Sequence, residues 1–352
     1  MQSAVPSSDR LMRAWSVRAP GALGSRPLRL GERPVPVPFP DEVLVEVTAC
    51  GLCRTDLHLA EGDLAPRRPD TVPGHQVVGR VVATGGAARR FRVGDRVGVA
   101  WLRRTCGSCR WCRNGAENLC PGSTYTGWDA DGGFAEYTVV PEAFAYRSPA
   151  SMSDLEVAPL LCAGIIGYRA LVRAAVPPAG RLGIYGFGSS AHITAQVAMA
   201  AGVEVFVMTR GESGQSLARS LGATWVGGVT DQPPSPLDSA IIFAPAGELV
   251  PVALEALDRG GTLALAGIYM SAVPELDYPR HLFQERTIQS VTANTRADGE
   301  ALLRIATRVP LDVHVTEYGF GQVDSALADL AADRVSGSVV ITGFRPHEPD
   351  PR

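Results

Sequence analysis

The sequence predicts an α/β protein with two domains, an irregular β domain and a doubly wound parallel sheet. The chain has 352 residues, which is about the length of two domains. Residues 43–49, 77–83 and 93–99 are rich in β-forming side chains, and turns separate them. From about residue 153, strand-like runs alternate with helix-like runs. This alternation is typical of a parallel sheet with crossover helices.

Six strand-like runs define the expected sheet, after a helix-like stretch at 155–172. These runs are 181–185, 203–209, 223–227, 238–243, 262–267 and 287–293. Helix-like runs at 192–201, 214–221 and 248–257 lie between them. After residue 295 we expect a helix, a run at 313–320, a short helix at 323–332, a closing strand at 339–342 and a disordered tail at 347–352.

Composition excludes several classes of function. Hydrophobic residues make up 45% of the chain, charged residues 20%, and the formal net charge is −3. Such a balance offers no basic surface for nucleic acid. The chain contains no lysine, so all 33 positive charges are arginine. Lysine-dependent chemistry, such as Schiff-base catalysis or the phosphate loop of nucleoside triphosphatases, is therefore excluded.

Neither a targeting segment nor a membrane span is expected. Residues 1–10 are polar, and no run reaches 18 uninterrupted apolar residues. We therefore expect a cytoplasmic protein without membrane contacts. In a reducing compartment, the seven cysteines point to metal binding or catalysis before disulfides.

Four cysteines form a compact cluster in the first half of the chain. Cys106, Cys109, Cys112 and Cys120 have the spacing Cys-x2-Cys-x2-Cys-x7-Cys. Four thiolates this close can surround one tetrahedral Zn²⁺, and a site filled by protein ligands has a structural role. Two disulfides or four unrelated buried cysteines are the alternatives. A reducing cytosol disfavours the first, and the regular spacing disfavours the second.

A second, open metal site draws on scattered residues. Cys53, His75 and Cys162 are far apart in sequence, and a single histidine after a turn is more often hydrogen-bonded than metal-binding. However, a catalytic zinc takes three protein ligands and leaves one position open. Two thiolates and one imidazole would neutralise the metal and leave it Lewis acidic.

Four sequence blocks resemble those of zinc-dependent medium-chain alcohol dehydrogenases. The blocks 51–58, 73–79, 106–112 and 162–164 occur in the order found in that family, and the resemblance extends from about residue 12 to 343. It implies a GroES-like catalytic domain formed by 1–160 and 297–352, with a structural zinc lobe at 101–125, and a Rossmann domain at 161–296. It also implies reversible hydride transfer between a primary alcohol or aldehyde and NAD(P)(H).

The resemblance assigns the metal sites residue by residue. Cys53, His75 and Cys162 match the catalytic zinc ligands, so two Zn²⁺ per chain are expected. Asp56 matches the carboxylate that orients the ligand histidine. Gln76 departs from the family, which usually has glutamate there. Loss of that negative charge should make the metal a stronger Lewis acid.

Further roles concern the proton, the cofactor and the substrate. Thr55 and His58 match a proton relay, and Arg54 matches a contact to the cofactor pyrophosphate. Trp101 matches a residue near the substrate. Together with Trp128 it would line an apolar slot that suits primary alcohols and aldehydes more than polyols. Trp128 could equally pack in the cysteine lobe.

The cofactor site follows the first strand of the expected sheet. Gly186, Gly188 and Ala191 form a Gly-x-Gly-x-x-Ala turn that opens a helix, which is the context of a dinucleotide site. The second strand ends in Thr209 and Arg210, where NAD enzymes place an acid. An arginine there suits a 2′-phosphate, which slightly favours NADP(H) over NAD(H). A solvated surface arginine is the alternative.

Two other functions remain open at this point. A zinc-independent medium-chain reductase of activated double bonds shares the fold but lacks the metal ligands. A catalytically silent dinucleotide-binding protein is favoured only by Gln76. The resemblance also suggests a homodimer or homotetramer with a small-molecule substrate.

Overall fold

The computed structural model describes residues 10–344, and these form two compact units. The first unit is drawn from Met1–Cys162, Asn294–Leu303 and Val315–Arg352, and the second from Ala163–Ala293 and Arg304–His314. The tail expected at 347–352 and residues 1–9 lie outside the described residues.

The observed units differ from the expected division in three segments. Residues 161–162 and 294–296 belong to the first unit, and the largest difference concerns residues 304–314. Residues 304–314 were expected in the catalytic domain, but they belong to the second unit. The Gln196 side chain accepts a hydrogen bond from the Asp312 backbone N–H at 2.7 Å and donates one to the Asp312 carbonyl at 2.9 Å. These paired bonds hold the segment against the helix that carries Gln196, and sequence periodicity gives no sign of them.

The first unit is built around a seven-stranded sheet. Its strand order is β16-β17-β3-β4-β5-β9, and β8 also pairs with β3. The strands are β3 (Glu42–Leu52), β4 (Gln76–Thr84), β5 (Arg96–Val99), β8 (Tyr137–Pro141), β9 (Ala145–Arg147), β16 (Val315–Gly319) and β17 (Ser338–Thr342). Buried valines such as Val43, Val45 and Val77 fill the core beside this sheet, as β-branched side chains do on a pleated surface.

Smaller elements complete the first unit. Two further pairs of strands are β1 (Leu11–Val17) with β2 (Leu28–Pro34), and β6 (Leu102–Arg104) with β7 (Thr124–Tyr125). The helices are α1 (Arg54–Glu61), α2 (Arg110–Arg113), α3 (Asp154–Pro159), α9 (Arg296–Ala306) and α10 (Val323–Ala331), and α9 continues into the second unit. Short 3-10 turns are η1 (Leu23–Ser25), η2 (Glu117–Leu119), η3 (Glu142–Phe144) and η5 (Phe320–Gln322).

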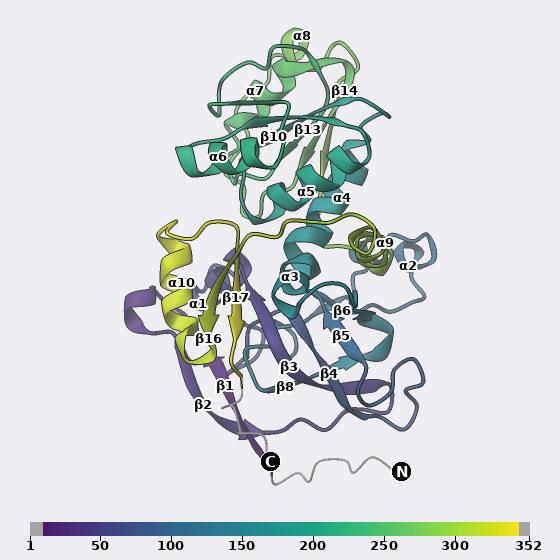
Figure 1. Cartoon of the computed structure of the whole chain (residues 1–352), viewed down its shortest axis with the longest axis vertical. Coiled ribbons are helices and arrows are strands. Elements are labelled where there is room, and N and C mark those ends of the chain that lie inside the picture. Colours follow the sequence, from purple (N-terminus) through teal and green to yellow (C-terminus); the bar gives the residue numbers. More distant parts are fainter. Residues whose placement is uncertain (1–9, 345–352) are drawn as a thin grey trace. The chain divides into compact units, whose positions relative to one another are not determined.

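The second unit contains the predicted doubly wound sheet (Figure 1). Its six parallel strands are β10 (Arg181–Tyr185), β11 (Glu204–Met208), β12 (Trp225–Gly227), β13 (Leu237–Ile242), β14 (Leu257–Leu265) and β15 (Thr287–Ser290). Their order is β12-β11-β10-β13-β14-β15. The order reverses between β10 and β13, which is the switch point of a dinucleotide-binding fold. The predicted fold class is thus confirmed.

Helices precede and connect these strands. They are α4 (Ile165–Ala174), α5 (Ser189–Ala200), α6 (Glu212–Ser220), α7 (Leu249–Ala256) and α8 (Tyr278–His281). Helices α4 and α5 pack closely because Gly167 has no side chain. A Cβ at Gly167 would lie 2.0 Å from Thr194 Oγ1.

The helix expected at 155–172 is interrupted. It consists of α3, a π-helical turn η4 (Leu160–Gly164) and α4. The whole run, Asp154–Ala174, is long and apolar enough to cross a membrane, by length and composition alone. However, 56% of its apolar window is buried by protein, and buried core helices can have the same length and composition. The run is therefore weak evidence for a span.

Candidate active site

Three potential metal ligands converge in the first unit. Cys53 precedes α1, His75 precedes β4, and Cys162 lies in the π-helical turn. Their ligand atoms all lie within 4.8 Å of one another, and Cys53 Sγ is 3.4 Å from His75 Nε2. Because Nε2 faces the thiol, it is the ring nitrogen directed at the centre of the cluster.

Asp56 holds two of these ligands in place. One carboxylate oxygen accepts a hydrogen bond from the Cys53 backbone N–H at 2.9 Å, and the other accepts one from Gly74 at 3.0 Å. The second oxygen also lies 3.4 Å from His75 Nδ1, within ion-pair range. Asp56 is only 2% exposed and His75 only 1%. A carboxylate on Nδ1 fixes the ring so that Nε2 is free to bind a metal.

The electrostatics of the cluster favour charged ligands. A hydrogen bond from Cys162 lowers the pKa of the Cys53 thiol well below its usual value, while burial opposes this effect and His75 adds to it. The same hydrogen bond, together with burial, raises the pKa of Cys162. Burial alone would lower the pKa of His75, but the charges of Asp56 and Cys53 raise it to about 10. A metal ion that binds here therefore displaces protons.

The residues present fit a catalytic zinc ion. Two sulfurs and one imidazole nitrogen within reach of one point are ligands that Zn²⁺ prefers, and three protein ligands leave a fourth position.

Gln76, at the position where the resemblance leads us to expect glutamate, is buried beside Gly51. A Cβ at Gly51 would lie 2.7 Å from Gln76 Oε1, so only glycine fits there.

The four-cysteine lobe fits a structural zinc ion. All four ligand atoms lie within 4.8 Å of one another. Cys109 Sγ and Cys106 Sγ lie 3.5 and 3.9 Å from Cys112 Sγ. Thiolates around tetrahedral zinc are separated by about 3.8 Å, given a Zn–S bond of about 2.3 Å. Hydrogen bonds from the backbone of Ser108 and Cys109 lower the pKa of Cys106 to about 6, which favours its thiolate.

Two ion pairs anchor this lobe to the rest of its unit. Arg296, at the start of α9, binds Glu117 of the lobe through two nitrogens at 2.7 and 3.0 Å, and its backbone N–H donates to the same carboxylate at 2.8 Å. The buried Arg103 pairs with the buried Glu42 at 2.7 Å. Paired and hydrogen-bonded in this way, the buried side chains of Glu117, Arg103 and Glu42 avoid the penalty of an isolated charge.

The two predicted relay residues lie on one face of α1. Thr55 and His58 are three positions apart and therefore project from the same side of the helix. His58 Nδ1 lies 3.0 Å from Asp63 Oδ2. The His58 side chain is 16% exposed and the Asp63 side chain 56%, so this pair runs from the protein interior to solvent.

Arg54 has a partner within its own unit. Its guanidinium pairs with Asp333, which follows α10, and helices α1 and α10 pack against each other. The predicted contact of Arg54 with a pyrophosphate would compete with this exposed ion pair.

An aromatic cluster borders His75. The Trp101 ring meets the His75 ring edge-on at 5.0 Å, and it stacks on Tyr125 at 4.9 Å and on Trp128 at 5.9 Å. Arg67 lies 3.7 Å from the centre of the Trp128 ring, and Trp128 Nε1 donates to the Ala65 carbonyl at 2.8 Å. The structure thus brings the two predicted tryptophans together beside the candidate metal site.

The predicted dinucleotide turn lies between β10 and α5 in the second unit. Gly186 has a φ of +85°, which only glycine adopts readily, and its N–H donates to Met208. Nothing lies within 4 Å of a Cβ placed on Gly188, so its outer face is open. Ala191 is fully buried on α5. Thr209 is also buried, and its hydroxyl accepts the Phe187 N–H at 3.2 Å, so this side chain fixes the turn.

Arg210, by contrast, is exposed at the end of β11. Within residues 10–344 it has no ion-pair partner, which leaves its guanidinium available for a ligand.

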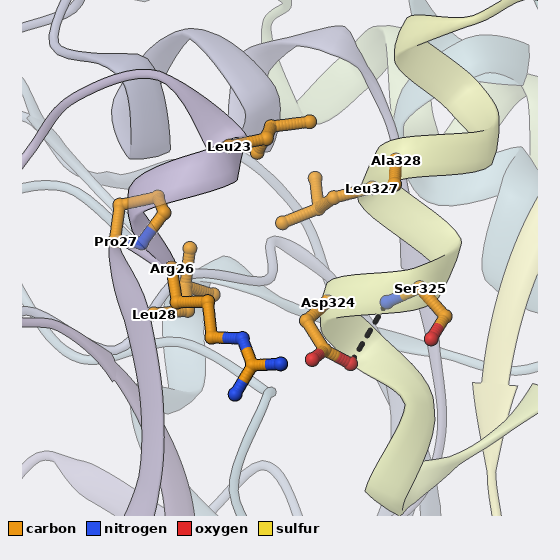
Figure 2. Close-up of a pocket in the computed structure, with 8 residues that line it drawn as sticks. All are labelled: Leu23, Arg26, Pro27, Leu28, Asp324, Ser325, Leu327 and Ala328. Atoms are coloured by element: carbon orange, nitrogen blue, oxygen red, sulfur yellow. Dashed lines mark hydrogen bonds between the residues drawn. The ribbon is translucent and has the colours of Figure 1, made fainter.

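A separate pocket lies on the first unit (Figure 2). Its volume is about 200 Å³, and Figure 2 shows Arg26 and Leu28 on one side and Asp324 and Leu327, both from α10, on the other. None of the metal-ligating or relay residues lines it, so it does not belong to the active site.

Sequence reasoning missed three residues of the site. Asp63 contacts His58, Tyr125 completes the aromatic cluster, and Glu117 anchors the zinc lobe. Of these three contacts, the sequence gives an indication only of the one made by Asp63. It follows Gly62, whose left-handed conformation (φ +96°) ends α1 and turns the chain back toward His58.

Comparisons with known proteins agree with this geometry. Residues 39–150 match the alcohol dehydrogenase GroES-like domain, and residues 191–308 match the zinc-binding dehydrogenase domain. A probable alcohol dehydrogenase, AdhA, of Mycobacterium tuberculosis (strain CDC 1551 / Oshkosh) is 57% identical over 341 residues, which cover 96% of this chain and 99% of that protein. An alcohol dehydrogenase of Geobacillus stearothermophilus is 33% identical over 85% of this chain and 91% of its own length.

Solved structures give the same result. A cinnamyl alcohol dehydrogenase from Sorghum bicolor superposes with a TM-score of 0.87 at 26% identity, over 97% of this chain and all of that one. A cobalt- and zinc-bound thermostable alcohol dehydrogenase from Pyrobaculum aerophilum has a TM-score of 0.84 at 27% identity, over 95% of this chain and all of its own. With both domain models matched and a relative this close over nearly its full length, the chain belongs to the zinc-dependent medium-chain alcohol dehydrogenases, oxidoreductases that use zinc and a nicotinamide cofactor.

Proposed function

We propose that this protein catalyses reversible hydride transfer between a primary alcohol or aldehyde and a nicotinamide dinucleotide. The cluster of Cys53, His75 and Cys162 carries this proposal, because it brings three metal-binding atoms together beside Trp101. A zinc ion with three protein ligands keeps a fourth position for substrate. Zinc held there would act as a Lewis acid on the substrate oxygen. Neither a zinc-independent reductase nor a silent binding protein requires this donor set.

The chain's own residues would manage the proton. Asp56 keeps His75 oriented through Nδ1, which leaves Nε2 for the metal. Thr55 would pass the hydroxyl proton of the alcohol toward His58. Because Asp63 engages His58 at Nδ1, the atom left to accept that proton is Nε2. The half-exposed Asp63 would then mark the exit to solvent.

The aromatic cluster supports a preference for apolar substrates. Trp101 lies against His75, and its stacking on Tyr125 and Trp128 gives the site a flat, rigid wall. A wall of this kind would favour flat or extended alcohols and aldehydes over polyols. The solved relative from Sorghum bicolor is a cinnamyl alcohol dehydrogenase, which is consistent with such a substrate.

NADP(H) is the proposed cofactor. The exposed Arg210 follows β11, and no carboxylate occupies the position where NAD enzymes hold the ribose 2′-hydroxyl. A guanidinium there would bind a 2′-phosphate through charge-assisted hydrogen bonds. Thr209 would act indirectly, by fixing the turn that precedes α5.

A homodimer or homotetramer is the proposed assembly. Within the described residues, β15 pairs only with β14, so one side of its backbone is available to a second copy. Tyr278 and Phe283 precede this strand, with 62% and 66% of their surface exposed, and their rings contact each other at 5.9 Å.

A cytoplasmic location is also proposed. All seven cysteines are free thiols, and a reducing compartment keeps thiols in this state.

The first experiment measures metal and turnover together. We expect two zinc ions per chain, one for each ligand cluster, and aldehyde-dependent oxidation of NADPH that a chelator abolishes. Metal content and the absorbance of NADPH and NADH are measured on the same preparation. One zinc ion without turnover would instead favour a silent dinucleotide-binding protein.

The two metal sites are separated by matched substitutions. Cys53→Ser should lower kcat by about a thousandfold or more and leave the fold intact, because Lewis-acid catalysis is worth several kcal/mol. Cys109→Ser should lower Tm by about 10 °C and reduce activity only as a consequence, because structural zinc contributes folding energy. Thermal unfolding and kinetics are measured on both variants. Equal loss of folding would contradict this division of roles.

Arg210→Ala tests the cofactor preference. The variant should bind NADPH about tenfold more weakly and NADH unchanged, because it loses charge-assisted bonds to the 2′-phosphate alone. Binding is followed by the fluorescence of each reduced dinucleotide. An unchanged preference would show that Arg210 is an ordinary surface residue.

Light scattering tests the assembly. The wild-type protein should be a dimer or tetramer, and the double substitution Tyr278→Glu, Phe283→Glu should shift it toward smaller species, because charges replace an apolar contact. The control is the double substitution Val37→Glu, Phe39→Glu, at two exposed apolar residues of the first unit. A monomeric wild type would rule out the proposed interface.

A further inference from the structure

A buried histidine with no role in the proposed chemistry lies next to the dinucleotide turn. His192 follows Ala191 on α5, and its side chain is fully buried. Buried polar side chains are retained where they satisfy specific hydrogen bonds. The partners of this ring therefore indicate what it does.

Two hydrogen bonds fix the protonation state of His192. The His314 backbone N–H donates to Nε2 at 3.3 Å, so Nε2 carries no proton. The neutral ring then has its proton on Nδ1, which lies 3.2 Å from the Gly188 carbonyl oxygen and donates to it. Burial also lowers the pKa of His192 to about 4, so the ring stays neutral near pH 7.

The acceptor of this bond is the residue that begins α5. Gly188 is the N-cap, and its carbonyl accepts both the His192 backbone N–H at 3.1 Å and the ring Nδ1–H. The carbonyl of Gly188 and the N–H of Ser189 belong to one planar peptide and point in opposite directions. Holding the carbonyl toward the helix therefore directs the Ser189 N–H outward, where an anion binds at a helix N-terminus.

Glycine makes this restraint necessary. Gly188 has no side chain, and nothing lies within 4 Å of the position of a Cβ. Its peptide could rotate more freely than that of any other residue type. The ring of His192 supplies a second donor to the carbonyl and opposes this rotation.

The ring also connects the turn to a distant segment of the same unit. His192 and Gln196 lie one helical turn apart, and both bond to backbone atoms of residues 312–314. The His314 side chain lies 3.3 Å from Asp312 of the same segment. The first turns of α5 are thus tied to the segment 312–314 through two side chains.

We propose that His192 is a positioning residue for the dinucleotide, which clamps the Gly188 carbonyl and thereby presents the Ser189 N–H to the cofactor pyrophosphate. The inference rests on the proposed dinucleotide site at the Gly186–Ala191 turn. It makes cofactor affinity depend on residues 312–314, which do not need to touch the cofactor.

Two substitutions at His192 and one control test this proposal. His192→Leu keeps an apolar side chain of similar size and removes both ring bonds. His192→Asn keeps an N–H donor near the position of Nδ1. Thr194→Val is the control, because the Thr194 hydroxyl donates an equally buried bond in the same helix, at 2.7 Å to the Ser190 carbonyl.

The readout is dinucleotide affinity, separated from turnover. We expect His192→Leu to raise the Kd and KM for the dinucleotide about tenfold, with kcat at saturating cofactor unchanged, which corresponds to the loss of one or two neutral hydrogen bonds. His192→Asn should recover most of this loss, and Thr194→Val should not change the Kd. Equal effects of His192→Leu and Thr194→Val, or none in either, would overturn the proposal.

Nitrogen NMR of the wild-type protein gives a second readout that does not depend on the variants folding. We expect the neutral ring of His192 to carry its proton on Nδ1, and a proton on Nε2 would contradict the inference. If the wild type bound neither NADPH nor NADH, the proposed dinucleotide site itself would be wrong. Normal wild-type binding with unaffected variants would reject only the role of His192.

Discussion

The active site depends on a single buried carboxylate, that of Asp56. One oxygen accepts the Cys53 backbone N–H, and the other accepts that of Gly74 and faces His75 Nδ1. These contacts join the start of α1 to the turn before β4, two segments that the sequence separates. A buried carboxylate without such partners would be costly, so its burial requires both segments to be in place. The metal ligands are therefore positioned by the fold before any metal binds.

The two metal clusters depend on the chain in different ways. The four cysteines of the lobe lie within 15 residues, so local turns bring them together, and the pair of Glu117 with Arg296 secures the lobe to α9. The catalytic cluster joins segments that are far apart, so it forms only when the sheet of the first unit does. This difference supports the proposed division of roles, in which metal at the lobe would contribute to stability and metal at the open site would contribute to chemistry.

The sequence predicted local features well and long-range contacts poorly. All six strands of the parallel sheet and the four-cysteine cluster follow from periodicity and spacing, which are local properties. The grouping of Cys53, His75 and Cys162 came only from a family resemblance. The contacts of Asp63, Tyr125, Glu117 and His192, and the position of residues 304–314, depend on side chains that meet across the fold. No periodic pattern or motif in the sequence indicates such long-range contacts.

The π-helical turn at Leu160–Gly164 shows how a local irregularity serves the site. Pro159 has no N–H to donate, and its ring crowds the carbonyl four residues earlier, so a regular α-helix cannot pass through it without distortion. The helix widens immediately afterwards, and Cys162 lies in the middle of the widened turn. Widening changes the direction of side chains within that turn, which is one reason such turns occur at functional sites. A continuous helix over 155–172 would direct residue 162 elsewhere, so the departure from the predicted helix is itself part of the ligand geometry.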